Sequence, residues 1–221
     1  MKSAEQIKGA VKNIAKKMNL KPQEILQIYM FERLVECLSV SKYKGNFILK
    51  GGLLIASMIG IAERTTMDMG MNIPMKIDIT TGDEITPRQI DYRYKCMFEE
   101  KSVLVKAYTL ETILAEKYET VMRRNIGNTR ARDFYDLFVL MKIKKNEIRW
   151  DILKEAVLAT SKKRGSWEEL KEYRKIIEEM RESDFLRRVW KKYKEENTYS
   201  EGIKFKDTLD TILEIGIMLE K

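Results

Sequence analysis

The sequence predicts an α+β protein in which helices flank a small mixed sheet and the C-terminal half is all-helical. Strand-like patterns, meaning short apolar runs and alternating apolar and polar residues, are confined to residues 47–108. Apolar residues at helical spacing occupy residues 3–40 and return from residue 109 onward. This change of period predicts two domains: residues 1–108, a sheet domain with N-terminal helices, and residues 109–221, a helical domain.

The composition is that of a folded, basic protein without histidine. The 221 residues are 34% charged and 44% hydrophobic, and the net charge is +8. The lack of histidine excludes His-based general-base catalysis and His metal ligands, and two cysteines, Cys37 and Cys96, are too few for a structural zinc site. A metal would need carboxylate ligands, which select hard cations such as Mg²⁺ or Mn²⁺. The positive charge suits nucleotides or RNA as partners, and it is equally ordinary for a protein from a lysine-rich proteome.

Sequence patterns for export and membrane insertion are missing from the chain. No apolar run approaches the roughly 20 residues that span a bilayer. The N-terminal stretch also lacks the continuous apolar segment of a signal peptide. Both cysteines lie among apolar residues, so we expect buried free thiols, as in a reducing compartment. The expected location is the cytoplasm, with no membrane partner.

The chain begins with a predicted pair of helices that cover the sheet. Residues 3–19 repeat apolar positions at helical spacing, and Pro22, which suits the first turn of a helix, opens the second. A short apolar run at residues 47–49 predicts a strand, and a short apolar helix follows Gly51 and Gly52. Because a helix N-terminus carries backbone N–H donors without partners, this junction could hold a phosphate.

Acidic residues follow at two positions that could meet at one edge of the sheet. Asp68 lies between two methionines, and Asp78 lies between two isoleucines. An acid that alternates with apolar neighbours on a strand points away from the buried face. Two such acids on adjacent strands commonly hold a divalent metal. Just before them, Arg64 and Thr66 could lie near bound phosphates or could form a polar turn.

A strand pair and further helices complete the predicted fold. Residues 92–98 and 102–108 alternate apolar and polar side chains and predict two strands. The remaining helices are predicted to start at residue 109 and to span residues 130–141, 150–159, 167–181, 185–194 and 205–219. Ser166 and Glu169 have the spacing of a capping box at the start of one of them.

Three charged residues of the helical half are candidates for a site. Lys117 lies beside the apolar stripe of its helix, where its ammonium could bind a triphosphate or the leaving pyrophosphate; a surface lysine with a shielded stem is the alternative. Asp133 and Asp136 share a helix face, and like charges so placed destabilise a helix unless a cation lies against them. Lys117, Arg130 or Arg132 could supply that cation.

The densest basic run, residues 187–194, also carries aromatic side chains. This combination could contact RNA phosphates and stack on a base. However, Val189 and Trp190 also fit the buried stripe of an amphipathic helix. We expect the amphipathic helix.

Several blocks of the sequence resemble one family. The runs LKGGLLIASMIGI, RTTMD, IPMKIDITTGD, LETILAEK and TRARDFYDL are similar to the AbiEii/AbiGii abortive-infection toxins of the polymerase-β-like nucleotidyltransferase superfamily, over most of residues 28–145. The resemblance implies a nucleotidyltransferase-type sheet and a Mg²⁺- or Mn²⁺-dependent transfer of NMP from an NTP to an RNA acceptor, with tRNA as one candidate. It also implies a toxin of a type IV-like toxin–antitoxin system, neutralised by a cognate antitoxin.

The resemblance also implies roles for the candidate residues. The implied metal ligands are Asp68 and Asp78. The implied nucleotide-binding residues are Gly51, Gly52, Arg64, Thr66 and Lys117. The implied catalytic residues are Lys117, Asp133 and Asp136, with the two acids acting near the acceptor or organising Lys117.

One position departs from the family pattern. The family has a second acid two residues after the position of Asp68, and this chain has Gly70 there. Because the next residues already resemble the following strand, we interpret the departure as a deletion after Met69 that removes a metal ligand. Since small misplacements at a reacting centre slow catalysis strongly, this loss would impair transfer. A catalytically inert nucleotide- or RNA-binding module and a helical interaction protein are the alternatives.

Overall fold

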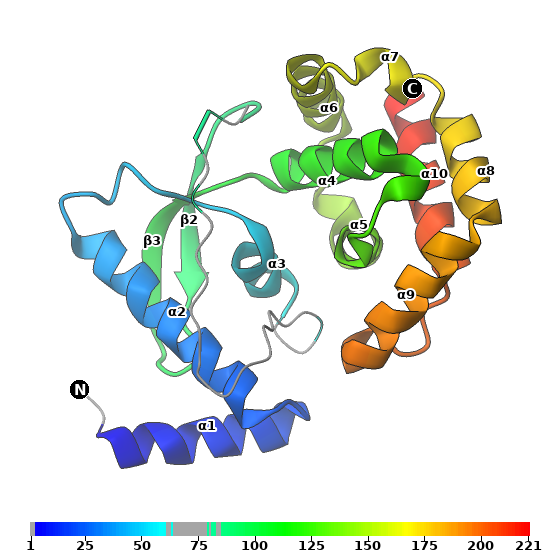
Figure 1. Ribbon diagram of the computed structural model, residues 1–221. Coiled ribbons are helices and arrows are strands. Elements are labelled where there is room, and N and C mark those ends of the chain that lie inside the picture. Colours follow the sequence, from blue (N-terminus) through cyan, green and yellow to red (C-terminus); the bar gives the residue numbers. More distant parts are fainter. Residues whose placement is uncertain (1–2, 61–62, 64–78, 80, 83–84) are drawn as a thin grey trace. The chain divides into compact units, whose positions relative to one another are not determined.

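A computed structural model describes residues 3–60, 63, 79, 81–82 and 85–221, and its α+β fold confirms the predicted class (Figure 1). The chain divides into two compact units. The first comprises Met1–Gly82 and Ile90–Ala107, and the second comprises Asp83–Gln89 and Tyr108–Lys221. Among the described residues, the first unit contains the sheet and the second is built of helices. The strand predicted around Asp78 lies outside the described residues.

Three strands form the sheet of the first unit in its described part. β3 (Ser102–Ala107) is central: it pairs in parallel with β1 (Ile48–Leu49) and antiparallel with β2 (Ile90–Lys95). The register places Tyr94 opposite Val103. Inward and exposed side chains alternate over residues 92–95, as the sequence pattern predicted, so one face of the strand pair faces the core. However, the strand begins at Ile90 and ends at Lys95 rather than at residue 98.

Of the two N-terminal helices, the second covers that face of the sheet and the first packs on the second, so the expectation that the pair covers the sheet is met by one helix. α1 (Ala4–Met18) packs against α2 (Pro22–Val40), and α2 contacts β3 (Figure 1). α1 ends where predicted, because Asn19 adopts the left-handed conformation with φ 53°. The core cluster between α1 and α2 contains Val11, Ala15, Ile25 and Phe98. The cluster between α2 and the sheet contains Val35, Tyr94 and Cys96.

Helix α3 (Gly51–Ile59) follows β1 directly, as the two glycines predicted. Gly51 has φ +72°, in the left-handed region that glycine adopts without strain. Three consecutive residues of the helix, Leu54, Ile55 and Ala56, are buried, and the Ser57 hydroxyl bonds the Tyr92 hydroxyl of β2 at 2.9 Å. α3 is therefore fixed to the sheet by both apolar packing and a hydrogen bond.

One side chain of α2 differs from expectation, and a second one, for which we had no expectation, is a buried acid. Cys96 is buried as expected, but Cys37 is exposed, because it lies two residues after Val35 and so faces away from the cluster on the sheet. Glu32 is a buried acid, 1% exposed, whose carboxylate accepts a hydrogen bond from the Met97 N–H at 2.7 Å. Burial raises the pKa of Glu32 to about 7, against the lowering effect of that hydrogen bond and of neighbouring positive charge.

The second unit is helical throughout its described elements. The α-helices are α4 (Leu110–Arg124), α5 (Ala131–Lys144), α6 (Trp150–Arg164), α7 (Trp167–Leu170), α8 (Tyr173–Glu182), α9 (Asp184–Glu196) and α10 (Phe205–Glu220). α4 packs against α5 and α6, and α5 packs against α10 (Figure 1). Thr109 caps α4 by accepting a hydrogen bond from the Thr112 N–H at 3.1 Å. The helix pattern after residue 109 is thus confirmed in outline.

Two predicted helices have the wrong bounds. The helix predicted at residues 150–159 continues to Arg164, because Thr160 and Ser161 are buried and the chain leaves the helix only at Gly165, with φ +70°. The helix predicted at residues 167–181 is two helices, α7 and α8, separated by a turn. Both sides of this turn are anchored by buried side chains, so packing overrides the continuous helical pattern.

The predicted capping box at Ser166 is also wrong. Ser166 is the residue before α7, but its side chain makes no capping hydrogen bond. Its hydroxyl instead donates to Glu119 Oε1 of α4 at 2.8 Å, and Ser166 is 1% exposed. A buried carboxylate is the stronger acceptor, so the serine serves a tertiary contact rather than the helix end.

Candidate functional site

The candidate site of the helical unit is a cluster of three charged side chains, Lys117 of α4 with Asp133 and Asp136 of α5, which we call the lysine triad. Lys117 Nζ lies 2.7 Å from Asp133 Oδ1 and 2.7 Å from Asp136 Oδ2. The side chains of Lys117 and Asp133 are 15% and 12% exposed, and that of Asp136 is 0% exposed. The triad therefore reaches the surface through Lys117 and Asp133 and is closed at Asp136.

Helix packing explains why these residues meet. Residues three apart on a helix are neighbours, so Asp133 and Asp136 present both carboxylates to one side of α5. α4 packs on α5, and Lys117 lies in the middle of α4. The other cations considered from the sequence, Arg130 and Arg132, are exposed. Lys117 is thus the cation that separates the two acids.

Charge balance keeps the lysine ionised. Burial lowers the pKa of Lys117, but Asp136 and Asp133 raise it by more, so its pKa lies above the ordinary value. An ammonium has three N–H donors, and the aspartates take two of them. The third can reach a ligand from a side chain that is partly exposed.

Outside the triad, a buried carboxylate of α4 that the sequence patterns did not reveal accepts several charged hydrogen bonds. Glu119 is 0% exposed and accepts hydrogen bonds from Arg123 Nε at 2.8 Å, Arg164 Nη1 at 2.6 Å and the Ser166 hydroxyl at 2.8 Å. Glu119 and Arg123 are four residues apart, a spacing that is typical of an ion pair on a helix. The sequence could have predicted this contact, but not the contacts to Arg164 and Ser166. The cluster joins α4 to α6 and to the start of α7, so we assign it a structural role.

The predicted phosphate-binding glycines lie in the first unit, at the start of α3. Lys50 precedes the helix in an extended conformation, and its side chain does not cap the helix. Apart from its chain neighbours, no heavy atom of the described residues would lie within 4 Å of a β-carbon placed on Gly51, so this part of the fold leaves the backbone open to approach there. A helix start of this kind offers N–H donors to a phosphate. The role of Gly51 and Gly52 in binding remains a prediction.

The other predicted binding residues, Arg64, Thr66, Asp68 and Asp78, lie outside the described residues. In the ranges that the structure does describe, no group of three or more cysteine, aspartate or glutamate side chains is placed to hold a metal. The donor chemistry of Asp68 and Asp78 fits a hard cation, because Mg²⁺ and Mn²⁺ prefer carboxylate oxygens. The metal site therefore remains a prediction from the sequence.

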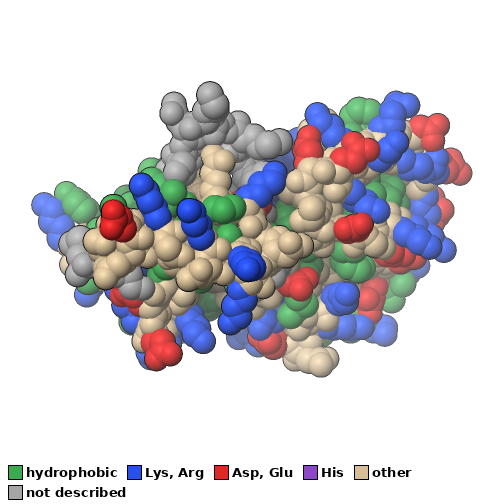
Figure 2. All heavy atoms as spheres, turned by 90° about the horizontal axis from the view of Figure 1, so that it is seen from below, with side chains coloured by type: hydrophobic (Ala, Val, Ile, Leu, Met, Phe, Trp, Pro, Cys, Tyr) green, Lys and Arg blue, Asp and Glu red, His purple; other side chains and the backbone are tan. Residues whose placement is uncertain are grey.

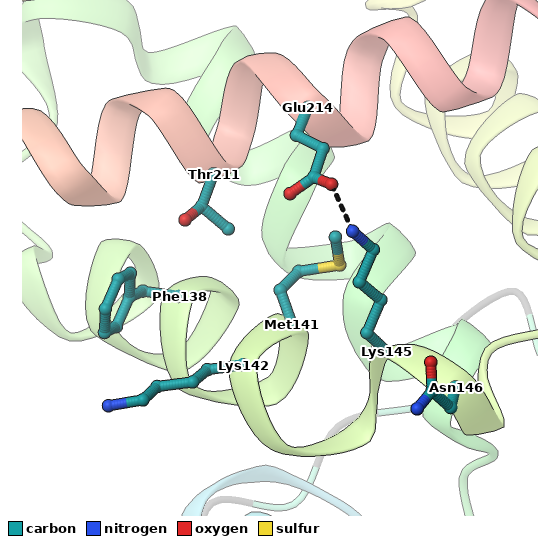
Figure 3. Close-up of a pocket in the computed structure, with 7 residues that line it drawn as sticks. All are labelled: Phe138, Met141, Lys142, Lys145, Asn146, Thr211 and Glu214. Atoms are coloured by element: carbon teal, nitrogen blue, oxygen red, sulfur yellow. Dashed lines mark hydrogen bonds and ion pairs between the residues drawn. The ribbon is translucent and has the colours of Figure 1, made fainter.

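A pocket of about 340 Å³ lies between α5, the turn after it and α10 (Figure 3). Its lining residues are Phe138, Met141, Lys142, Lys145, Asn146, Thr211 and Glu214. The Lys145 ammonium points to the Glu214 carboxylate and pairs with it, which reduces the positive charge of the pocket (Figure 3). None of the predicted site residues lines it, so we do not assign it to the reaction.

The sequence resemblance implied two features of a nucleotidyltransferase. The described structure contains a helix that starts at paired glycines after a strand, and a lysine held between two acids. Comparison with family models matches residues 70–214 to the nucleotidyl transferase AbiEii toxin of type IV toxin–antitoxin systems. The chain therefore belongs to the AbiEii nucleotidyl transferase toxin family, which confirms the predicted family. Searches of curated proteins and of solved structures found no match.

The matched range bears on two features of the sequence. It contains the whole lysine triad, so these three residues belong to the part of the chain that the family shares. It begins at Gly70, the residue where the chain departs from the pattern expected of a second metal acid. Separately, within the described ranges no helix combines the length and apolar character needed to cross a membrane.

Proposed function

We propose that the protein transfers a nucleoside monophosphate from an NTP to an RNA acceptor, with tRNA as one candidate, and needs Mg²⁺ or Mn²⁺. The observation that carries the proposal is the mostly buried, charged Lys117 between two acids, within the range that matches nucleotidyl transferase toxins. A cation held in a region of low dielectric stabilises developing negative charge more strongly than a solvated one. In the cell, the activity would act as a toxin that a cognate antitoxin neutralises.

In this reaction an acceptor hydroxyl oxygen attacks the α-phosphorus of the NTP. The bond between the α-phosphorus and the oxygen bridging to the β-phosphate breaks, and pyrophosphate leaves with that electron pair. The remaining N–H donor of Lys117 would bind a phosphate oxygen and stabilise the pyrophosphate as it forms. The hydroxyl proton must pass to a base or to water.

The two acids of the triad differ in what their burial allows. Asp136 has a fully buried side chain, so it would act as a positioning residue that holds Lys117. Asp133 is partly exposed and could also receive the proton of an acceptor hydroxyl, although its bond to Lys117 favours the positioning role for it too. Because one lysine holds both, a change to either acid would displace the ammonium.

The sheet unit has its own predicted contacts to the NTP. Gly51 and Gly52 would offer backbone N–H groups to the phosphates, and Arg64 and Thr66 would add charge and a hydroxyl. Asp68 and Asp78 would hold the metal, which neutralises phosphate charge and lowers the pKa of the attacking hydroxyl. The role of this unit would be to orient the NTP.

Gly70 favours a second candidate function. If the second metal acid is missing, the remaining carboxylates could still bind one Mg²⁺–NTP without placing it for reaction. The protein would then be an inert nucleotide- or RNA-binding module. A helical interaction protein, the third class, would bind no NTP.

One set of assays separates the three. Protein, Mg²⁺ or Mn²⁺ and total RNA are incubated with each α-³²P-labelled NTP in turn, and thermal unfolding is measured with and without each unlabelled NTP. Transfer of label by the wild type, lost in Asp78→Asn, would support the proposed enzyme. A Mg²⁺-dependent NTP stabilisation that Asp78→Asn abolishes, without any transfer, would support the binding module and refute the enzyme. No stabilisation by any NTP and no transfer would refute the enzyme and the nucleotide-binding module and would favour the interaction protein.

A further inference from the structure

Helix α1 carries a row of lysines on its exposed side. Lys8, Lys12 and Lys16 follow one another at intervals of four residues, so they lie on one side of the helix. All three side chains are exposed. With a rise of 1.5 Å per residue, the row is about 12 Å long. We call these three residues the lysine stripe.

The lysine stripe carries charge that the described part of the chain does not neutralise. No ion pair or hydrogen bond joins Lys8, Lys12 or Lys16 to an acid among the described residues. α1 contains a single acid, Glu5, in its first turn. Like charges four residues apart destabilise a helix, so the stripe works against the stability of the protein alone. A basic surface of this kind attracts negatively charged partners.

The basic run that stands out in the sequence is different. On α9, Arg187 pairs with Asp184 at 2.6 Å, and Lys192 lies 3.9 Å from Glu196. Trp190 is 4% exposed and stacks on Tyr193, so its ring is not available to a base. The run therefore behaves as the amphipathic helix that we expected, and much of its charge is already paired.

The packing of α1 narrows the kind of partner. Its apolar side is in the core, where Val11 and Ala15 join Ile25 and Phe98. A helix that binds a membrane surface inserts its apolar side among the lipids, and a helix that docks in a protein groove buries that side too. Neither mode is open to α1 while it remains folded on α2. What α1 offers outward is a row of charges, which suits the phosphates of a polyanion.

We propose that the lysine stripe binds the phosphate backbone of RNA. Figure 2 looks at the molecule from below the view of Figure 1, the side on which α1 lies, and shows Lys and Arg side chains projecting from this part of the first unit. Lysines bind phosphates as point charges and without base readout, so the stripe would hold RNA in a largely sequence-independent way. The inference deepens the proposed function, on which it rests, by naming a surface that holds the RNA acceptor.

The test is the salt dependence of RNA binding. A fluorescein-labelled 20-nucleotide oligouridylate is titrated with wild type and with Lys8→Gln/Lys12→Gln/Lys16→Gln, and anisotropy gives Kd at several KCl concentrations. The plot of log affinity against log salt concentration has a negative slope, and each lost phosphate contact to single-stranded RNA should reduce its steepness by about 0.7. The loss of three contacts should therefore reduce the steepness by about 2. We expect affinity near 0.1 M salt to fall tenfold or more.

A charge-matched variant controls for net charge. Lys144→Gln/Lys171→Gln/Lys192→Gln removes the same three charges from lysines with acidic neighbours, at Glu147, Glu168 and Glu196 respectively. The slope of this control variant should differ from that of the wild type by less than about 0.7, the value for one contact. Equal losses in both variants, or an unchanged slope in the stripe variant, would overturn the proposal.

Two further readouts keep the result interpretable. Thermal unfolding should show the stripe variant as stable as the wild type or more so, because its like charges are gone. Label transfer is measured separately: stripe-dependent RNA binding without transfer would refute the proposed enzyme and leave this inference standing. Transfer by a stripe variant with unchanged RNA affinity would refute this inference alone.

Discussion

Replacement of Lys117 by methionine should destabilise the helical unit strongly. Methionine keeps most of the length and apolar stem of lysine but removes the ammonium that lies 2.7 Å from both Asp133 and Asp136. The two carboxylates would then face each other with no cation between them, one of them fully buried. Removal of one partner from a buried ion pair typically costs about 3–5 kcal/mol, and the partial exposure of Asp133 places the expected loss near about 3 kcal/mol.

The loss should depend on pH in a defined direction. Two close carboxylates cannot both stay ionised, so the pKa of one rises in the folded variant above the unfolded value of about 3.9. The folded variant then binds more protons than the unfolded chain, and its stability falls as pH rises from about 4 through the raised pKa. In the wild type, Lys117 keeps both acids paired over this range. The penalty of the substitution should therefore be larger at pH 8 than at pH 5.

Urea unfolding followed by circular dichroism at both pH values measures this penalty. The control is the triple variant Lys117→Met/Asp133→Asn/Asp136→Asn, which removes the uncompensated charges. It should regain part of the lost free energy of unfolding, and its penalty relative to wild type should no longer depend on pH. A penalty under about 1 kcal/mol for Lys117→Met, or the same penalty at both pH values, would refute the account of the triad as a coupled buried cluster.

Three more substitutions test other parts of the structure. Burial raises the pKa of Glu32 to about 7, so between about pH 4.5 and 7 the folded chain binds more protons than the unfolded chain, and its stability falls as pH rises. In Glu32→Gln, urea unfolding at pH 5 and pH 8 should show a decline in stability that is smaller than in the wild type by up to about 3 kcal/mol. Glu119→Ala strips a buried acceptor from two arginines and a serine and should lower the free energy of unfolding by about 3 kcal/mol, whereas Glu168→Ala, in an exposed pair, should cost under about 0.5; similar losses would contradict the burial argument. Gly51→Ala has room for the new methyl group but must keep φ at +72°, so thermal unfolding should show a loss of about 1 kcal/mol in the free energy of unfolding. The control Gly45→Ala, which has equal space and no positive φ, should show no loss. Equal stability of the two variants would mean that the turn at Gly51 relaxes.

Local sequence patterns were sufficient for the elements whose packing follows from their own period. The apolar spacing of α1, the alternation over residues 92–95 of β2 and the helix start at residue 109 each depend on residues close in sequence, and each was predicted. The break between α7 and α8 could not be read in this way, because Leu170 and Tyr173 continue the helical spacing across the turn. What divides them is how the chain packs on the rest of the unit.

The candidate site shows the same division. The three-residue spacing of Asp133 and Asp136 predicted that a cation must lie against them, since like charges on one helix face repel. Which cation it is depends on how α4 packs against α5, and only the structure distinguishes Lys117 from the two arginines. The buried acids Glu32 and Glu119 were missed for a related reason: their donors come from distant parts of the chain.

The central claim, nucleotidyl transfer, is tested most directly by comparing two labels on one NTP. The protein is incubated with Mg²⁺, total RNA and the NTP labelled with ³²P at either the α- or the γ-phosphate. Attack on the α-phosphorus predicts RNA labelled from the α-phosphate only, with the γ-label recovered in pyrophosphate, and loss of both products in Asp78→Asn. RNA labelled from the γ-phosphate would show phosphoryl transfer instead, and RNA labelled from neither, by a folded protein with every NTP, would contradict the assignment of this chain as an active transferase.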